Sequence, residues 1–206
     1  MEGQEYLNQL AAATRPEKKS KISQILSSKL FIFGMVSLAL LIIIIIIGAI
    51  LGGNKGGEKN LGSALKLHID NTTSIINSYQ STIKSSDLRS SSASLYSILK
   101  MTSQELTDYL TTAHKYKEKD VSKTIINQAT EAKTALESEL FEAKINGILD
   151  RVYAHKMTYE ISVLMSEEAK LMKTTSNGTL DTLLTTSYNS LEVLYEKFSD
   201  FSETKN

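Results

Sequence analysis

The side chains that most often carry chemistry in proteins are few and widely spaced in this chain. It has no cysteine, which removes thiolate nucleophiles and thiolate metal ligands. Its three histidines, His68, His114 and His155, each lack a second histidine three or four residues away, and none completes a Glu-x-x-His motif. Helical zinc pairs and the di-iron bundle signature are therefore absent. His155 is the most interesting of the three because it lies in the most apolar helical stretch, although an ordinary or half-exposed histidine is the favoured interpretation.

Motifs for phosphate binding and acyl transfer are missing as well. The glycine-rich segment 52–57 does not have the spacing of a P-loop, and no strand is expected before it. Serine is plentiful, but no Gly-x-Ser-x-Gly elbow occurs. The sequence therefore predicts no catalytic, cofactor-binding or metal-binding residue, no cofactor, and a protein that is not an enzyme.

Charge is balanced over the whole chain, which has 23 basic and 23 acidic residues and a pI near 6.8. Nucleic acid is excluded as a partner because a basic footprint is missing. Five of the basic and three of the acidic residues precede Gly52, so residues 52–206 have a net charge of −2. This value argues against a C-terminal domain that binds anionic lipid.

The most informative segment is Leu30–Leu51, which is uncharged and contains six consecutive isoleucines, Ile42–Ile47. At about 1.5 Å per residue, a helix over this segment is roughly 33 Å long, enough for a hydrocarbon core of about 30 Å. A removable signal has a shorter apolar core followed by a small-x-small cleavage site, and Ile50 and Leu51 interrupt that pattern. We expect an uncleaved signal-anchor, a single-pass transmembrane helix over 30–51, with the lipid bilayer as its partner.

Basic residues flanking this segment indicate its orientation. The short polar tail 1–29 carries five basic residues, whereas Lys55, Lys59 and Lys66 are the three that follow closely. The tail is therefore predicted to be cytoplasmic and the C-terminal domain extracytoplasmic, at the plasma membrane. Two interpretations of the tail lysines remain open: they determine topology, or they contact anionic lipid of the inner leaflet. The candidate membrane-surface contacts are Lys18, Lys19, Lys21 and Lys29.

After a glycine-rich hinge, 52–59, residues 60–203 are predicted to form a helical-bundle domain. The only proline is Pro16, and after Leu61 glycine occurs only at positions 62, 147 and 178, whereas a sheet needs more turn residues. Apolar residues follow alternating steps of four and three, the heptad pattern of helices packed at about 20°. The three seams are Leu65-Ile69-Thr72-Ile76-Tyr79-Ile83, Leu88-Ser92-Leu95-Leu99-Thr102-Leu106-Tyr109-Ala113-Tyr116 and Leu180-Leu184-Ser187-Leu191-Leu194-Phe198-Phe201.

The breaks between seams predict the helix boundaries. We expect helices over about 60–84, 88–117, from 121 onward, 148–174 and 179–201, with Asp87 and Asp120 as N-caps. Asn146-Gly147 either ends a helix or weakens one long helix over 121–174. Polar residues on the seams favour a bundle with polar layers over a long coiled coil. The fold class is thus all-α: one N-terminal transmembrane helix, then an antiparallel bundle of four or five helices.

The segment 148–172 differs from the others because its apolar residues do not fit one stripe. Two interpretations are open: this helix is the core of the bundle, or one of its sides meets a partner or a second copy. Methionines suit both a core and an adaptable surface. The candidate interface residues are Tyr153, Met157, Tyr159 and Met165. The charged residues near 167–173 are interpreted as the solvated end of the helix.

Three functions fit these features. The favoured one is a membrane-anchored structural or protein-interaction module at the cell surface or envelope, with an unknown protein partner or self-association. The second is a sensory or ligand-binding bundle, an analogy at the level of the fold. The third is a tethered enzyme with an unrecognised site. A pocket with converging polar groups would favour the second, and a solid core with an exposed apolar strip would favour the first.

Overall fold

The computed structural model describes residues 57–204, and within that range every regular element is helical. The tail 1–29, the apolar segment 30–51 and most of the hinge lie outside the described residues, so their predictions stay predictions. Among residues 57–204, no helix combines the length and the apolar character needed to cross a bilayer. The prediction of an all-α bundle is confirmed for this part of the chain.

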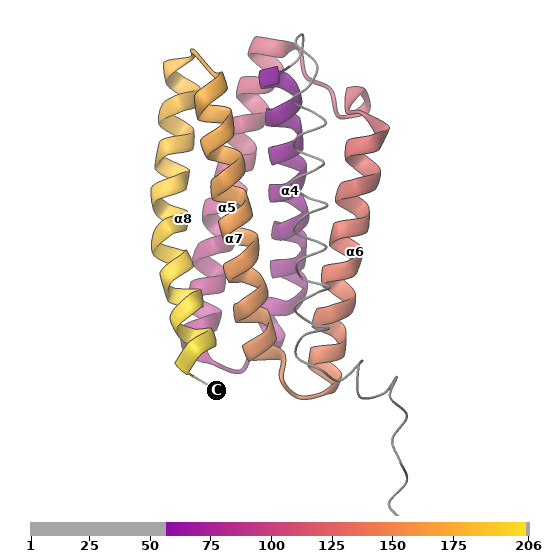
Figure 1. The fold of residues 1–206 in the computed structure, drawn as a ribbon, viewed down its shortest axis with the longest axis vertical. Helices are drawn as coiled ribbons and strands as arrows, with labels where there is room; N and C mark the ends of the chain where they lie inside the picture. The colour runs from indigo at the N-terminus through magenta and orange to yellow at the C-terminus, as the bar shows by residue number, and fades with distance from the viewer. Residues whose placement is uncertain (1–56, 205–206) are drawn as a thin grey trace, which may run out of the picture. The chain divides into compact units, whose positions relative to one another are not determined.

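Five α-helices make up the described part, as Figure 1 shows. They are α4 (Gly57–Tyr79), α5 (Ser86–His114), α6 (Lys123–Ile145), α7 (Leu149–Thr174) and α8 (Gly178–Thr204), with two 3-10 turns, η1 (Gln80–Thr82) and η2 (Glu118–Asp120). Each predicted helix is present, and most boundaries differ from the prediction by a few residues. Asn146-Gly147 does end a helix, because Gly147 adopts a φ of 72° between α6 and α7.

Serines, and not the predicted aspartates, cap two of these helices. The Ser85 side chain accepts a hydrogen bond from the Leu88 backbone N–H at the start of α5. Ser122 does the same for the Thr124 backbone N–H at the start of α6. A hydroxyl and a carboxylate cap about equally well, so composition alone does not choose between neighbours. Asp87 instead lies in the first turn of α5, where its negative charge interacts favourably with the helix dipole.

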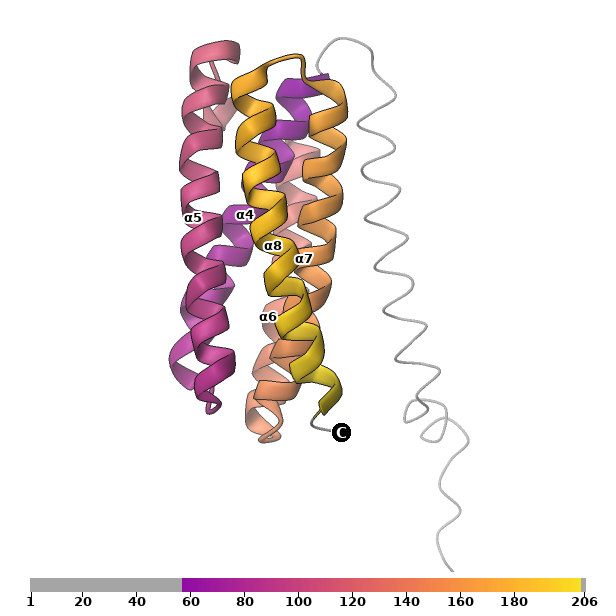
Figure 2. The ribbon, with the colours of Figure 1, turned by 90° about the vertical axis from the view of Figure 1, so that its left-hand side faces the viewer.

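Four helices form a closed ring, and the fifth lies outside it. In the ring, α4 contacts α5, α5 contacts α8, α8 contacts α7, and α7 contacts α4. Successive helices run in opposite directions along the bundle, as Figures 1 and 2 show. Helix α6 lies on the outside of the ring, where it packs against α4 and α7, opposite α8 in Figure 1. The core therefore belongs mainly to α4, α5, α7 and α8.

The heptad seams predict the core of α4, α5 and α8 well. The seam from Leu65 to Ile83, which begins in α4 and ends just after η1, is buried throughout. In α8, the seam is buried from Leu180 to Phe198. The α5 seam departs near its end, where Leu110 is buried while Ala113 is exposed. The four polar seam residues, Thr72, Ser92, Thr102 and Ser187, are all buried, which confirms the polar layers.

Helix α7 turns out to have one buried stripe. Its fully or nearly buried residues on that stripe are Leu149, Tyr153, Met157, Ile161, Leu164, Glu168 and Leu171. The positions from Leu149 to Ile161 are four residues apart, and from Ile161 onward they follow the steps of three and four of the other seams. Other apolar residues of this helix, such as Val152 and Met165, are half-buried beside the stripe. The breadth of the apolar set arises from these flanking residues, and α7 is a ring helix of the core.

Candidate functional site

A carboxyl group lies inside the core on the α7 stripe. Glu168 is 0% exposed. The Ser187 hydroxyl of α8 donates a 2.6 Å hydrogen bond to Glu168 Oε1, and the Thr102 hydroxyl of α5 donates to Ser187 Oγ at 3.1 Å. Three helices thus meet in one chain of hydrogen bonds. The interpretation of Glu168 as part of a solvated helix end is wrong, because its heptad position turns it inward.

The Glu168 carboxyl group is only partly satisfied. Its second oxygen, Oε2, is buried without a hydrogen-bond partner among the described residues. Burial raises the pKa of Glu168 to about 7, the neighbouring charge of Glu167 adds to the rise, and the Ser187 hydrogen bond opposes it. Near neutral pH the neutral and the ionised forms of this carboxyl group are therefore both populated.

A groove runs between α5 and α8 next to this chain of hydrogen bonds. It has a volume of about 450 Å³ and opens to solvent. The buried hydroxyls of Thr102 and Ser187 belong to its lining, Met101 supplies an apolar wall, and Glu105 contributes a carboxylate. The remaining lining is mostly threonine and leucine of α8, from Gly178 onward. The groove is a place where a small polar molecule could contact hydroxyl groups that lead to Glu168.

A second polar cluster joins α4 to α7. His68 Nδ1 lies 2.9 Å from Glu167 Oε2, and His68 Nε2 lies 2.8 Å from Glu160 Oε2. Burial by itself lowers the pKa of His68, but the charges and hydrogen bonds of Glu167 and Glu160 outweigh it and raise the pKa to about 10. His68 is therefore an imidazolium that donates both N–H groups. With no free lone pair, this ring cannot act as a base or bind a metal ion.

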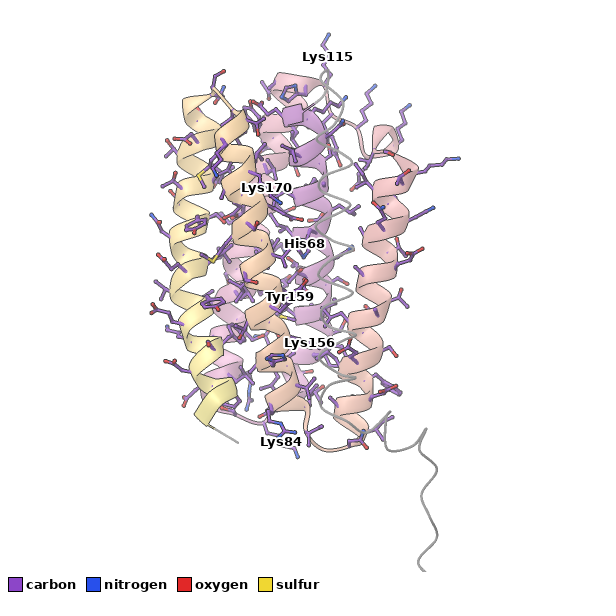
Figure 3. The ribbon with its side chains drawn as sticks, in the orientation of Figure 1. His68, Lys84, Lys115, Lys156, Tyr159 and Lys170 are labelled. Carbon is purple, nitrogen blue, oxygen red and sulfur yellow. The ribbon has the colours of Figure 1, made fainter. Side chains whose placement is uncertain are left out.

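Tyr159 lies beside this cluster on α7. Figure 3 shows His68 and Tyr159 at mid-height in the bundle. The Tyr159 hydroxyl is buried without a hydrogen-bond partner among the described side chains. Burial raises the pKa of Tyr159, and the charges of Glu160 and Glu167 raise it further. This neutral phenol cannot serve as a nucleophile near neutral pH.

A third cluster lies where the chain enters the bundle. The Tyr109 hydroxyl donates to Glu58 Oε1, which also lies 2.8 Å from His114 Nε2. Partial burial by itself raises the pKa of Glu58, but hydrogen bonds from Tyr109 and His114 outweigh it and lower the pKa. This cluster fixes the first turn of α4 against the last turns of α5.

The predicted interface residues divide into two pairs. Tyr153 and Met157 are fully buried in the core, where the Tyr153 hydroxyl is 2.6 Å from Ser92 Oγ. Tyr159 and Met165 are half-buried. His155, the histidine that the sequence singles out, is exposed on α7 and belongs to none of the three clusters. The tail lysines Lys18, Lys19, Lys21 and Lys29 lie outside the described residues.

Sequence reasoning missed both Glu168 and the His68 cluster. Extending the α7 heptad from Ile161 and Leu164 reaches position 168, so the inward direction of Glu168 was readable from spacing. The His68 cluster left no such signal, because its acidic partners lie 92 and 99 residues away along the chain. Only the pairing of α4 with α7 brings them together.

The described residues include no group of three or more histidine, cysteine or acidic side chains arranged to hold a metal ion. Their polar clusters are ion pairs and hydrogen-bond chains that join helices. In comparisons with known proteins, no family model, curated protein or solved structure matches this chain.

Proposed function

We propose that the chain is a membrane-anchored helical bundle that works by binding another protein at the cell surface or envelope. The apolar segment 30–51 supports the anchor through its length and lack of charge. The polar clusters of the described bundle support a binding role, because they join neighbouring helices. The proposal then needs a surface through which the bundle could bind.

An exposed apolar strip at the end of α6 is the observation that carries this proposal. Phe141, Ile145 and Ile148 are 57%, 69% and 41% exposed. Their spacing of four and three residues places Phe141 and Ile145 on one face of α6, and Ile148 follows directly in the α6–α7 turn. Scattered apolar residues are normal on a surface, but a contiguous apolar strip is typical of interaction sites. Because Tyr153 and Met157 are buried, this strip is a better candidate surface than α7.

Site-specific photocrosslinking in native membranes tests the proposal. A photoreactive amino acid at position 145 should give one dominant protein adduct, and Phe141→Ser should remove that adduct by disturbing the same strip. Val193 of α8 provides the matched control, because it is 54% exposed and equally apolar. Equal, diffuse labelling from positions 145 and 193 would contradict a specific partner at α6.

The groove between α5 and α8 favours a second function, a bundle that binds a small polar ligand. Its support is the buried hydroxyl pair of Thr102 and Ser187 in the lining, linked to the half-satisfied Glu168. A screen of small polar metabolites for thermal stabilisation tests it. A true ligand should lose its effect in Thr186→Leu, which fills the groove from its exposed side, and should keep it in Thr134→Leu on α6.

A further inference from the structure

The end of the bundle where α4 begins is rich in exposed lysines. These residues, called the lysine end here, come from the α5–α6 connection, the start of α6 and the end of α7. They are Lys115, Lys117, Lys119, Lys123 and Lys173. Figure 3 shows Lys115 projecting from this end, while Lys84 marks the opposite one.

Most of the acidic groups described at this end already have partners. Glu58 is held by Tyr109 and His114. Glu118 Oε1 lies 3.6 Å from Lys66 Nζ, and Lys66 is not part of the lysine end. Asp181 of α8 is exposed, and no salt bridge joins a lysine of the lysine end to a described acidic side chain. Among the described side chains, these five ammonium groups therefore have no acidic partner.

The opposite end of the bundle has a different composition. Exposed or half-exposed basic residues alternate there with acidic ones across all the helix ends. They are Lys84, Arg89, Lys144, Arg151 and Lys197, beside Asp87, Glu142, Asp150 and Glu196. The net charge of −2 for residues 52–206 sums both ends and does not exclude a local excess of basic side chains at one of them.

Helix stability explains only part of the lysine end. Lys115 and Lys173 lie at helix C-termini, where a cation is favourable. Lys123 is the first residue of α6, whose first turn contains no acidic residue, and there the dipole disfavours a cation. Lys117 and Lys119 lie in the connection outside both long helices. The helix dipoles therefore do not account for these three lysines.

The covalent chain joins the lysine end to the apolar segment. Gly57 begins α4 at this end, and Leu51 lies only six residues earlier. Six extended residues span at most about 22 Å. If residues 30–51 cross a membrane, this tether keeps the start of α4 close to the lipid headgroups.

We propose that the lysine end binds anionic phospholipid headgroups of the membrane in which residues 30–51 are anchored. The inference rests on the proposed anchor. Lysine suits this role because its ammonium stays hydrated and mobile while it attracts a charged surface. The contact is electrostatic, so it weakens at high salt.

Lysine footprinting of the full chain in nanodiscs tests the proposal. The full chain is reconstituted in phosphatidylcholine alone or in phosphatidylcholine with phosphatidylglycerol, and amine acetylation is followed by mass spectrometry. At low salt we expect the acetylation rates of Lys115, Lys117 and Lys119 with the anionic lipid present to be roughly half of those in phosphatidylcholine alone, or lower. Lys84 and Lys197 should react equally in both lipids, and high salt should abolish the difference.

A variant pair sharpens the result. Lys115→Gln/Lys117→Gln/Lys119→Gln should reduce the protection of the remaining Lys123 and Lys173, whereas Lys84→Gln/Lys144→Gln/Lys197→Gln should not. All six positions are exposed, so neither variant threatens the core. Equal reactivity of the lysine end in both lipids, with the chain incorporated, would overturn the headgroup contact alone.

The same samples separate this failure from failure of the anchor. A chain that does not co-elute with either kind of nanodisc lacks the proposed anchor, and the headgroup contact falls with it. A chain that co-elutes only with anionic nanodiscs, with its lysine end protected, retains the headgroup contact without a spanning segment. Incorporation into both lipids with protection only in the anionic one supports both proposals.

Discussion

Glu168 costs the described bundle stability when it is ionised, since a buried carboxylate loses its hydration. Because the pKa of Glu168 is higher in the folded than in the unfolded state, the stability of the bundle depends on pH. Below the unfolded value of 4.5 both states are protonated and the cost is absent, and as pH rises through the folded pKa of about 7 the cost is fully expressed. One side chain thus makes the bundle less stable as pH rises from 4.5 to 7.

Glu168→Gln should remove this pH dependence. Glutamine mimics the protonated carboxyl group and can still accept from Ser187. We expect equal stability of the two proteins near pH 4 and a gain of about 1–3 kcal/mol for the variant at pH 8. Urea denaturation at a series of pH values measures it, with the exposed Glu192→Gln as control. A variant less stable at pH 8 than at pH 4 by as much as the parent would contradict the assignment.

His68→Gln should lose the opposite kind of group, a favourable cation. Because its pKa is raised to about 10, the stability from His68 is fully present below the unfolded value of 6.5 and is lost as pH rises toward 10. At pH 6 we expect a loss of about 1–3 kcal/mol, between values for exposed and buried ion pairs. The difference should shrink by pH 9 in chemical denaturation. His155→Gln, at an exposed position, should show neither effect.

What the sequence could reveal at this scale depended on local spacing. Residues within one seam, such as Ser92 and Thr102, were predictable because the heptad places them in the core. The Glu168 position was equally readable, but its charge favoured a solvated interpretation. The partners of His68 were not readable, since no pattern within α4 specifies that α7 packs against it.

At the scale of elements, Gly147 is the residue that separates α6 from α7. Its φ of 72° lies in the left-handed region, and a Cβ there would meet no atom within 4 Å. Gly178, at the start of α8, also has open space but no positive φ. These two glycines therefore form a natural pair for testing backbone conformation separately from packing.

Gly147→Ala should destabilise the bundle by about 1 kcal/mol, because alanine is strained in the left-handed region. Gly178→Ala should be neutral or stabilise by about 0.4–1 kcal/mol by reducing the freedom of the unfolded chain. Thermal denaturation followed by circular dichroism compares them. If both substitutions shift the melting temperature equally, the turn at Gly147 does not control the α6–α7 junction.

Helix boundaries were predictable because the breaks are marked by turn residues and by interruptions of the heptads. The packing order was not. A seam says which face of a helix is buried, but not which neighbour covers it. Nothing in the α6 pattern shows that this helix lies outside the ring, although only Ile125, Leu136, Leu140 and Ala143 are buried on it.

At the scale of the whole molecule, the proposed anchor would determine where the bundle works. The mature protein should retain residues 1–29, because the segment 30–51 lacks a small-x-small cleavage site. Intact-mass spectrometry of protein purified from membranes measures this, and a mature N-terminus near Gly52 would rule the anchor out. Ile45→Arg should impair insertion by roughly 2.5–3.5 kcal/mol, whereas Ile45→Leu should not. Alkaline extraction of the membranes measures the fraction of each variant that is integrated in the bilayer.

The position of α6 outside the ring has a consequence for local unfolding. The ring of α4, α5, α8 and α7 keeps most of its contacts when α6 detaches, so the free energy of opening α6 is lower than that of global unfolding. Backbone amides of α6 should therefore exchange with deuterium earlier than those of the ring helices. A partner seated on Phe141 and Ile145 would slow that exchange, making the outer helix a direct reporter of binding.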